Sequence, residues 1–196
     1  ICMSAFILSL YAQFQQTDQS TTQQTTTSSS SIVLKPTAYD WIDPISPTYF
    51  DPDGGANFNL AERGVNIGFT FTYFGVGYTR CNISSNGFIT LGNYTEGLIP
   101  GDSPPTEFPW KGEPHTTIAC LWAPLVLTGN IWYETIDDPQ KGKMFVVTWE
   151  RMFISDFGNG WGWVTSTWCT FQLILHESGD ITMQYKNVPL FATWND

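Results

Sequence analysis

Few residues in this sequence have the types and spacing that covalent chemistry requires. The only two histidines are His115 and His176, and no serine lies in the Gly-x-Ser-x-Gly context that presents a hydrolase nucleophile. Glu134 and Glu150 could act as paired catalytic carboxylates, but residue type alone supports them. The acidic segment Asp51–Gly55 lacks an EF-hand pattern and is more typical of a turn than of a calcium site. We therefore expect a protein that is not an enzyme, with no catalytic residues, no metal site and no cofactor.

The four cysteines are candidates for disulfide bonds. They are Cys2, Cys81, Cys120 and Cys169; none belongs to a Cys-x-x-Cys motif, and their spacing fits no zinc site. In an oxidising compartment we expect disulfides among them, and Cys2 could bond to another subunit. The alternative is that they are buried free thiols, which pack as small apolar side chains.

Two asparagines lie in N-glycosylation sequons. Asn82 begins Asn-Ile-Ser, and Asn93 begins Asn-Tyr-Thr. If the chain is secreted, both are predicted glycan acceptors on solvent-facing strand ends or loops.

A tryptophan-rich segment is the strongest local sign of ligand binding. Residues 158–163 alternate three glycines with Asn159, Trp161 and Trp163, and Trp168 follows closely. Exposed tryptophans can stack on sugar rings or anchor a partner, so these three tryptophans form a candidate ligand platform. The competing interpretation is that they fold back and cover the core.

Composition narrows the classes of partner and fold. The chain has 196 residues, a length that suits one ordinary domain, and its formal charge is -10 with only eight Lys and Arg residues. Nucleic acid is not an expected partner, because binding its phosphates requires many basic side chains. An apolar content of 42% is too high for a chain that is disordered throughout.

The first 31 residues differ sharply from the rest. Residues 1–14 carry no charge, whereas sixteen of the seventeen residues at 15–31 are Ser, Thr or Gln, as in a linker. The apolar segment is too short for a membrane span, which needs about 20 apolar residues. Its pattern fits a strand or an amphipathic helix, and that choice stays open. We expect it to dock on protein through a set of mainly apolar side chains: Met3, Phe6, Ile7, Leu8, Leu10, Tyr11 and Phe14.

The pattern of residues 32–196 predicts an all-β domain. Short alternating runs rich in β-branched and aromatic residues are separated by Gly and Pro. We expect two packed antiparallel sheets, a jelly-roll-like β-sandwich with residues 1–31 as an extended N-terminal tail. The predicted strands are Val65–Tyr73, Thr79–Ser84, Phe88–Leu91, Thr117–Trp122, Asn130–Thr135, Met144–Arg151, Thr165–Glu177 and Asp180–Lys186.

Four segments of this domain occur in an order that is typical of one known family. Val65–Gly92 contains Phe-x-Phe-x-Tyr-Phe-Gly followed by Ser-Asn-Gly-Phe; the others are Ile118–Leu125, Phe145–Glu150 and Phe171–Val188. Together, over about residues 60–190, they resemble a nidogen-type (NIDO-like) extracellular module. The resemblance implies a secreted or surface-displayed, non-catalytic module that takes part in adhesion and matrix assembly.

From these features we expect a structural subunit of an extracellular fibre or matrix. Residues 1–14 of one copy would insert as a strand into a neighbouring copy, with residues 15–31 spanning the gap. Such head-to-tail contacts build open filaments, so other copies of the chain are the expected partners. The alternative is a monomeric secreted adhesion or carbohydrate-binding module, for which glycans are the partners.

Overall fold

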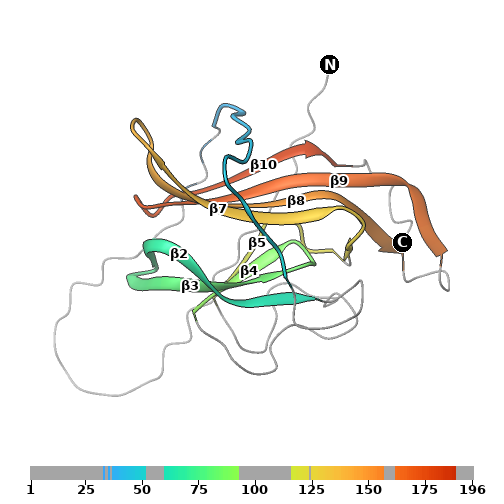
Figure 1. Ribbon diagram of the computed structural model, residues 1–196, viewed down its shortest axis with the longest axis horizontal. Helices are drawn as coiled ribbons and strands as arrows, with labels where there is room; N and C mark the ends of the chain where they lie inside the picture. The colour runs from blue at the N-terminus through green and yellow to red at the C-terminus, as the bar shows by residue number, and fades with distance from the viewer. Residues whose placement is uncertain are drawn as a thin grey trace.

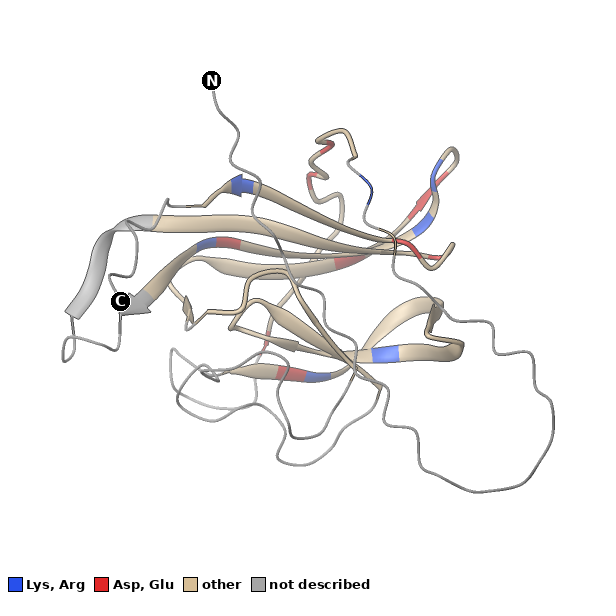
Figure 2. Cartoon of the chain, turned by 180° about the vertical axis from the view of Figure 1, so that it is seen from behind, with Lys and Arg blue, Asp and Glu red and all other residues tan. Residues whose placement is uncertain are grey.

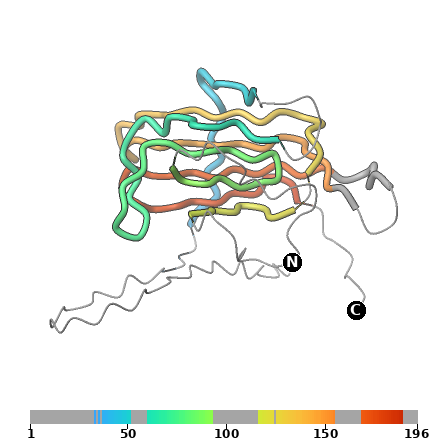
Figure 3. Tube along the Cα trace, turned by 90° about the horizontal axis from the view of Figure 1, so that it is seen from below, coloured from blue at the N-terminus to red at the C-terminus, as the bar shows by residue number. Residues whose placement is uncertain are grey.

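The chain folds into two antiparallel β-sheets that pack face to face (Figure 1). The structure, a computed structural model, describes residues 33, 35, 37–51, 60–92, 116–123, 125–156 and 162–188, with the backbone alone at 155–156 and 162–167. The docking segment 1–14 and the linker 15–31 lie outside these residues. Strands of the two sheets run in nearly the same direction (Figure 3), which is the aligned packing of β-sandwiches.

Among the described residues, sheet A has six strands and sheet B has four. Sheet A follows the order β1-β7-β8-β9-β10, and β6 pairs with β8 beyond the end of β7. Its strands are β1 (Thr48–Tyr49), β6 (Leu125–Val126), β7 (Asn130–Asp138), β8 (Gly142–Asp156), β9 (Gly162–His176) and β10 (Ile181–Asn187). Sheet B follows the order β2-β3-β4-β5, with β2 (Ala61–Tyr73), β3 (Val76–Ser84), β4 (Phe88–Leu91) and β5 (Thr117–Ala119).

The predicted all-β sandwich is confirmed, and each of the eight predicted strands is present. The strands β7 to β10 of sheet A are neighbours in chain order, as are β2 to β5 of sheet B, so each sheet contains a four-stranded meander. In sheet A, β1 reaches β7 by a crossover, and β6 pairs with β8. The interleaved strand order of a jelly roll does not occur among the described strands. The two strands that the pattern missed, β1 and β6, have two residues each and are too short to show alternation.

The core lies between the sheets, because each strand alternates apolar and polar side chains. In β2, Val65, Ile67, Phe69 and Phe71 point inward and are buried, while the residues between them are exposed. At the centre the fully buried ring of Trp149 stacks on Phe171, with 5.1 Å between the ring centroids. Charged residues are sparse along the strands (Figure 2), which leaves these inner faces apolar.

The β3–β4 hairpin ties the two sheets together. Gly87 has a φ of +84°, and a Cβ at this position would lie 2.2 Å from the carbonyl oxygen of Leu121, so a side chain does not fit. The indole Nε1 of Trp149, in sheet A, donates a hydrogen bond of 2.9 Å to the carbonyl oxygen of Ser84, in sheet B. The predicted turn at Asn86-Gly87 therefore also connects sheet B to sheet A.

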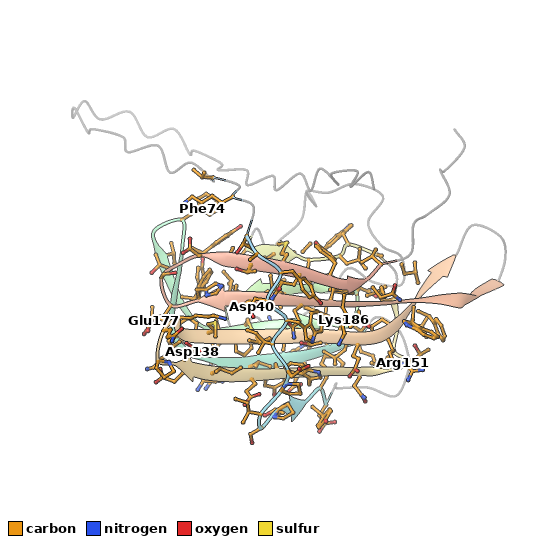
Figure 4. All side chains as sticks on the ribbon, turned by 90° about the horizontal axis from the view of Figure 1, so that it is seen from above. Asp40, Phe74, Asp138, Arg151, Glu177 and Lys186 are labelled. Carbon is orange, nitrogen blue, oxygen red and sulfur yellow. The ribbon has the colours of Figure 1, made fainter. Side chains whose placement is uncertain are left out.

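The outer face of sheet A carries a row of side chains that crosses its strands. Trp132 in β7, Thr148 in β8, Gln172 in β9 and Gln184 in β10 are register partners. Residues 39–46, which we call the strap, run across these strands, as Figure 4 shows at Asp40.

Two glutamines bind the strap as a neighbouring strand would. The side-chain amide of Gln172 donates to the carbonyl oxygen of Ile42 (2.6 Å), and its oxygen accepts from the Ile42 N–H (3.3 Å). Gln184 makes the same pair of bonds with Asp40, each 2.7 Å long. An ion pair between the Asp40 carboxylate and Lys141 adds to this attachment. Both glutamines are buried. Without the strap, their side-chain amides would lack hydrogen-bond partners, which would destabilise the fold.

The C-terminal half of the strap is held by one carboxylate. The two oxygens of Glu134 accept hydrogen bonds from the N–H groups of Ile45 (2.9 Å) and Ser46 (2.8 Å). In the N-terminal half of the strap, the Trp41 ring lies beside β10: its centre is 5.1 Å from the ammonium group of Lys186. Beneath the strap lies a small second apolar cluster: Trp132, Met144, Val146 and Ile174.

Candidate functional site

A β-bulge in β8 creates an unusual surface at one end of sheet A. The register with β9 shifts between Trp149 and Met152, and Arg151, between them, has a φ of +54°. For a residue with a side chain, this left-handed conformation costs roughly 1–2 kcal/mol. Bulges redirect side chains and are frequent beside functional sites, as are strained residues.

The bulge is held from both sides by threonine hydroxyl groups. The N–H of Arg151 donates to Oγ1 of Thr170 (3.0 Å), and Oγ1 of Thr128 donates to the carbonyl oxygen of Arg151 (2.8 Å). At Gly129, a Cβ would lie only 1.9 Å from the carbonyl oxygen of Glu150. These contacts therefore hold the backbone of Arg151 in place without a bound ligand.

The redirected guanidinium group lies over an exposed tryptophan. Its carbon is 5.1 Å from the centre of the Trp168 ring, within the range of a cation–π interaction. Trp168, in β9, is 42% exposed and pairs in register with Phe153 of β8. The side-chain amide of Asn187 donates to the carbonyl oxygen of Trp168 (2.7 Å), which fixes this strand to β10.

Arg151, Phe153 and Trp168 line a pocket of about 360 Å³, near the lower end of the volumes seen for ligand sites. Arg151 lies at the end of the sheet in Figure 4. The lining combines aromatic rings, one cation, an amide and a hydroxyl group: Thr128, Gly129, Asn130, Arg151, Phe153 and Trp168. An aromatic face beside a few polar groups is the arrangement that binds a small polar ring.

Of the three predicted platform tryptophans, the structure places Trp168 at this pocket. Trp161 and the side chain of Trp163 lie outside the described residues. Sequence reasoning did not identify Arg151, Asn130 or Thr128. A charged residue at the end of a predicted apolar strand was the only signal for Arg151, and the bulge that redirects it leaves no sequence mark.

The disulfide prediction is not supported for the three cysteines that the structure describes. Cys81, Cys120 and Cys169 are all unpaired and buried in the core, as in the alternative that they are free thiols. The thiols of Cys120 and Cys169 donate to the carbonyl oxygens of Gln172 and Met152, each at 3.3 Å. Burial raises the pKa of these two thiols to about 12 and also raises that of Cys81. Cys2 lies outside the described residues.

The predicted glycan at Asn82 conflicts with the fold. Asn82 is 7% exposed; its Nδ2 donates to Oγ1 of Thr90 (3.1 Å), and its oxygen accepts from the Gly64 N–H (2.9 Å). Because a glycan would have to be attached to that same buried nitrogen, the structure argues against one here. Asn93, the other predicted acceptor, lies outside the described residues, as do the docking side chains of residues 1–14.

The carboxylates considered for catalysis do not face each other. Glu134 binds the strap through both of its oxygens from the middle of β7, and Glu150 lies at one end of the β7–β8 register, across from Asn130. Within the described residues no group of three or more His, Cys, Asp or Glu side chains is arranged to hold a metal ion. The described part of the chain also contains no helix long and apolar enough to cross a membrane.

The sequence of this chain matches a known protein family. A family model described as NIDO related matches residues 49–193, a range that contains nine of the ten strands and the pocket. No solved structure gives a significant match to the chain.

Proposed function

The chain belongs to the NIDO-related family, and on this basis we propose that it is an extracellular adhesion module that binds a glycan in the pocket around Trp168. The family match suggests an extracellular protein. The observation that carries the proposal is the exposed Trp168 ring, fixed beside Arg151 in a pocket that also offers Asn130 and Thr128. Sugar rings bind proteins by stacking their apolar faces on aromatic rings while their hydroxyl groups form hydrogen bonds.

A glycan array probed with the full chain tests this function. We expect selective binding that is lost in Trp168→Ala. The matched control is Trp41→Ala, which removes the tryptophan that lies beside Lys186 in the strap and outside the pocket lining. Binding that survives Trp168→Ala, or that both variants lose equally while remaining folded, would contradict the proposed site.

Assembly with other copies is a second function, and the strand order supports it. Within the described ranges β2 and β10 each pair with a single strand, so each offers backbone N–H and C=O groups along its other edge. The apolar segment 1–14 and its polar linker could reach such an edge on a neighbouring copy. In this proposal the chain is a fibre subunit that polymerises by strand donation.

A double variant, Phe6→Asp/Leu10→Asp, tests strand donation. It should abolish filaments in negative-stain microscopy, because two carboxylates cannot be buried in an apolar groove. The control Thr21→Asp/Thr25→Asp adds the same charge to the linker and should polymerise normally. Filaments of normal length from the Phe6/Leu10 variant would rule out insertion of the tail.

A further inference from the structure

We propose that the pocket selects sugars that carry a carboxylate, such as uronic acids. This inference rests on the proposed glycan-binding function and specifies the class of ligand. It starts from the charge of the pocket: among the described residues that line it, Arg151 alone is charged. A guanidinium group keeps its positive charge at any physiological pH.

The charge of Arg151 is not neutralised by its own fold. Among the described residues no carboxylate forms an ion pair with its guanidinium group, which lies over the Trp168 ring. The chain as a whole carries a formal charge of -10, so an isolated cation in a pocket is a local exception. A bound carboxylate would supply the missing partner through two parallel hydrogen bonds.

The backbone at Arg151 supports a binding role over a purely structural one. The bulge holds this residue at a φ of +54°, and two threonines and Gly129 keep it there. A surface arginine that served only for solubility would not need a strained conformation. Here the conformation places the guanidinium group over the Trp168 ring, in the lining of the pocket.

The remaining lining groups match the rest of such a sugar. The Asn130 side chain has both donors and acceptors, and the Thr128 hydroxyl group donates to Arg151 but can still accept. Phe153 and the exposed part of Trp168, whose ring the guanidinium group covers on one side, provide apolar surface for a sugar ring. Each ligand feature, that is the carboxylate, the hydroxyl groups and the ring face, has its own counterpart in the pocket.

Saturation-transfer NMR on the full chain tests the inference, because it detects affinities in the millimolar range. The probes are methyl glucuronide, its neutral methyl ester, methyl glucoside and acetate. We expect the glucuronide to bind about 10-fold or more tightly than the ester, as one charge-assisted bidentate contact would give. Raising the salt concentration should weaken binding of the glucuronide and leave binding of the ester unchanged.

Variants then assign this preference to Arg151. Arg151→Gln should abolish the difference between glucuronide and ester, and Arg151→Lys should restore part of it, because a lysine keeps the charge without the planar fork. Lys186→Gln is the matched control, since it removes the cation that lies beside Trp41 and should leave the preference intact. Circular dichroism spectra identical to wild type establish that the variants are folded.

The possible failures are distinguishable. If the glucuronide and the ester bind equally and Trp168→Ala abolishes both, the glycan site stands and the carboxylate preference is wrong. If acetate binds as tightly as the glucuronide, the pocket is a simple anion site and the inference is also overturned. If neither sugar binds, or if binding survives Trp168→Ala, the proposed function itself fails at this site.

Discussion

The hydrogen bonds between Gln172 and the strap lead to a quantitative prediction. Replacing Gln172 with alanine removes two hydrogen bonds to Ile42, each with a net value of about 1 kcal/mol. It also leaves the N–H and C=O of Ile42 without these partners against a largely apolar surface, at a further cost of about 1–3 kcal/mol. We expect the free energy of unfolding to fall by about 3–5 kcal/mol, unless the strap detaches first.

Urea denaturation followed by tryptophan fluorescence measures this loss, and limited proteolysis reports on the strap itself. If residues 39–46 detach, the unpaired groups of Ile42 reach water, so the loss of stability stops there. Detachment would also expose new protease cleavage sites. The control is Gln140→Ala, which makes the same chemical change in the exposed β7–β8 turn and should cost less than about 0.5 kcal/mol.

A charged variant provides an independent check of the geometry. Gln172→Glu keeps an acceptor for the Ile42 N–H but directs a second acceptor at the Ile42 carbonyl oxygen. A proton on the new carboxyl group restores the donor, so this variant should gain stability as the pH falls. If Gln172→Ala is no less stable than Gln140→Ala, the glutamine does not hold the strap and the reasoning is refuted.

Three further predictions concern the core and its edges. Gly87→Ala should lower the free energy of unfolding by roughly 2 kcal/mol or more, because the added Cβ would clash with the Leu121 carbonyl group. The control Gly142→Ala has a similar φ of +75° but open space around it, so it should cost only about 1–2 kcal/mol. Thermal denaturation measures both losses. The three core thiols should stay unmodified by iodoacetamide at pH 8 in the native protein and react in urea, as peptide mass spectrometry would detect; since burial raises their pKa values, a rapid native reaction would contradict their placement. Expression in a glycosylating host should yield no glycan at Asn82, and intact-mass analysis showing a glycan there in folded protein would contradict the buried amide.

Much of the fold could be predicted because it depends on local alternation. Runs such as Val65–Phe71 place one face inward wherever they occur, and glycine-containing turns separate them. The same reasoning failed for Asn82, where a short polar motif was interpreted as solvent-facing although it lies in a fully buried stretch of β3. A sequon describes what an enzyme recognises in an unfolded chain and not where the asparagine lies after folding.

The strap and the pocket could not be predicted, because both depend on residues far apart in the chain. Gln172 and Ile42 are separated by 130 positions, and a glutamine in a strand carries no sign of such a partner. At the pocket, Trp168 stood out by its type, but its cationic neighbour is set by the register shift in β8. Register shifts depend on how two whole strands pair, so the identity of a single residue does not predict them.

The direction of the strap has a mechanical consequence. Because it runs across the strands, a pull from its N-terminal side loads its attachments one after another: the Gln184 pair first, then the Gln172 pair, then Glu134. Attachments that bear load singly yield at lower force than a strand drawn along its length, where all bonds resist together. Under load the strap can therefore detach before the sandwich unfolds. Its eight residues then release roughly 25 Å of chain, at about 3.3 Å per residue.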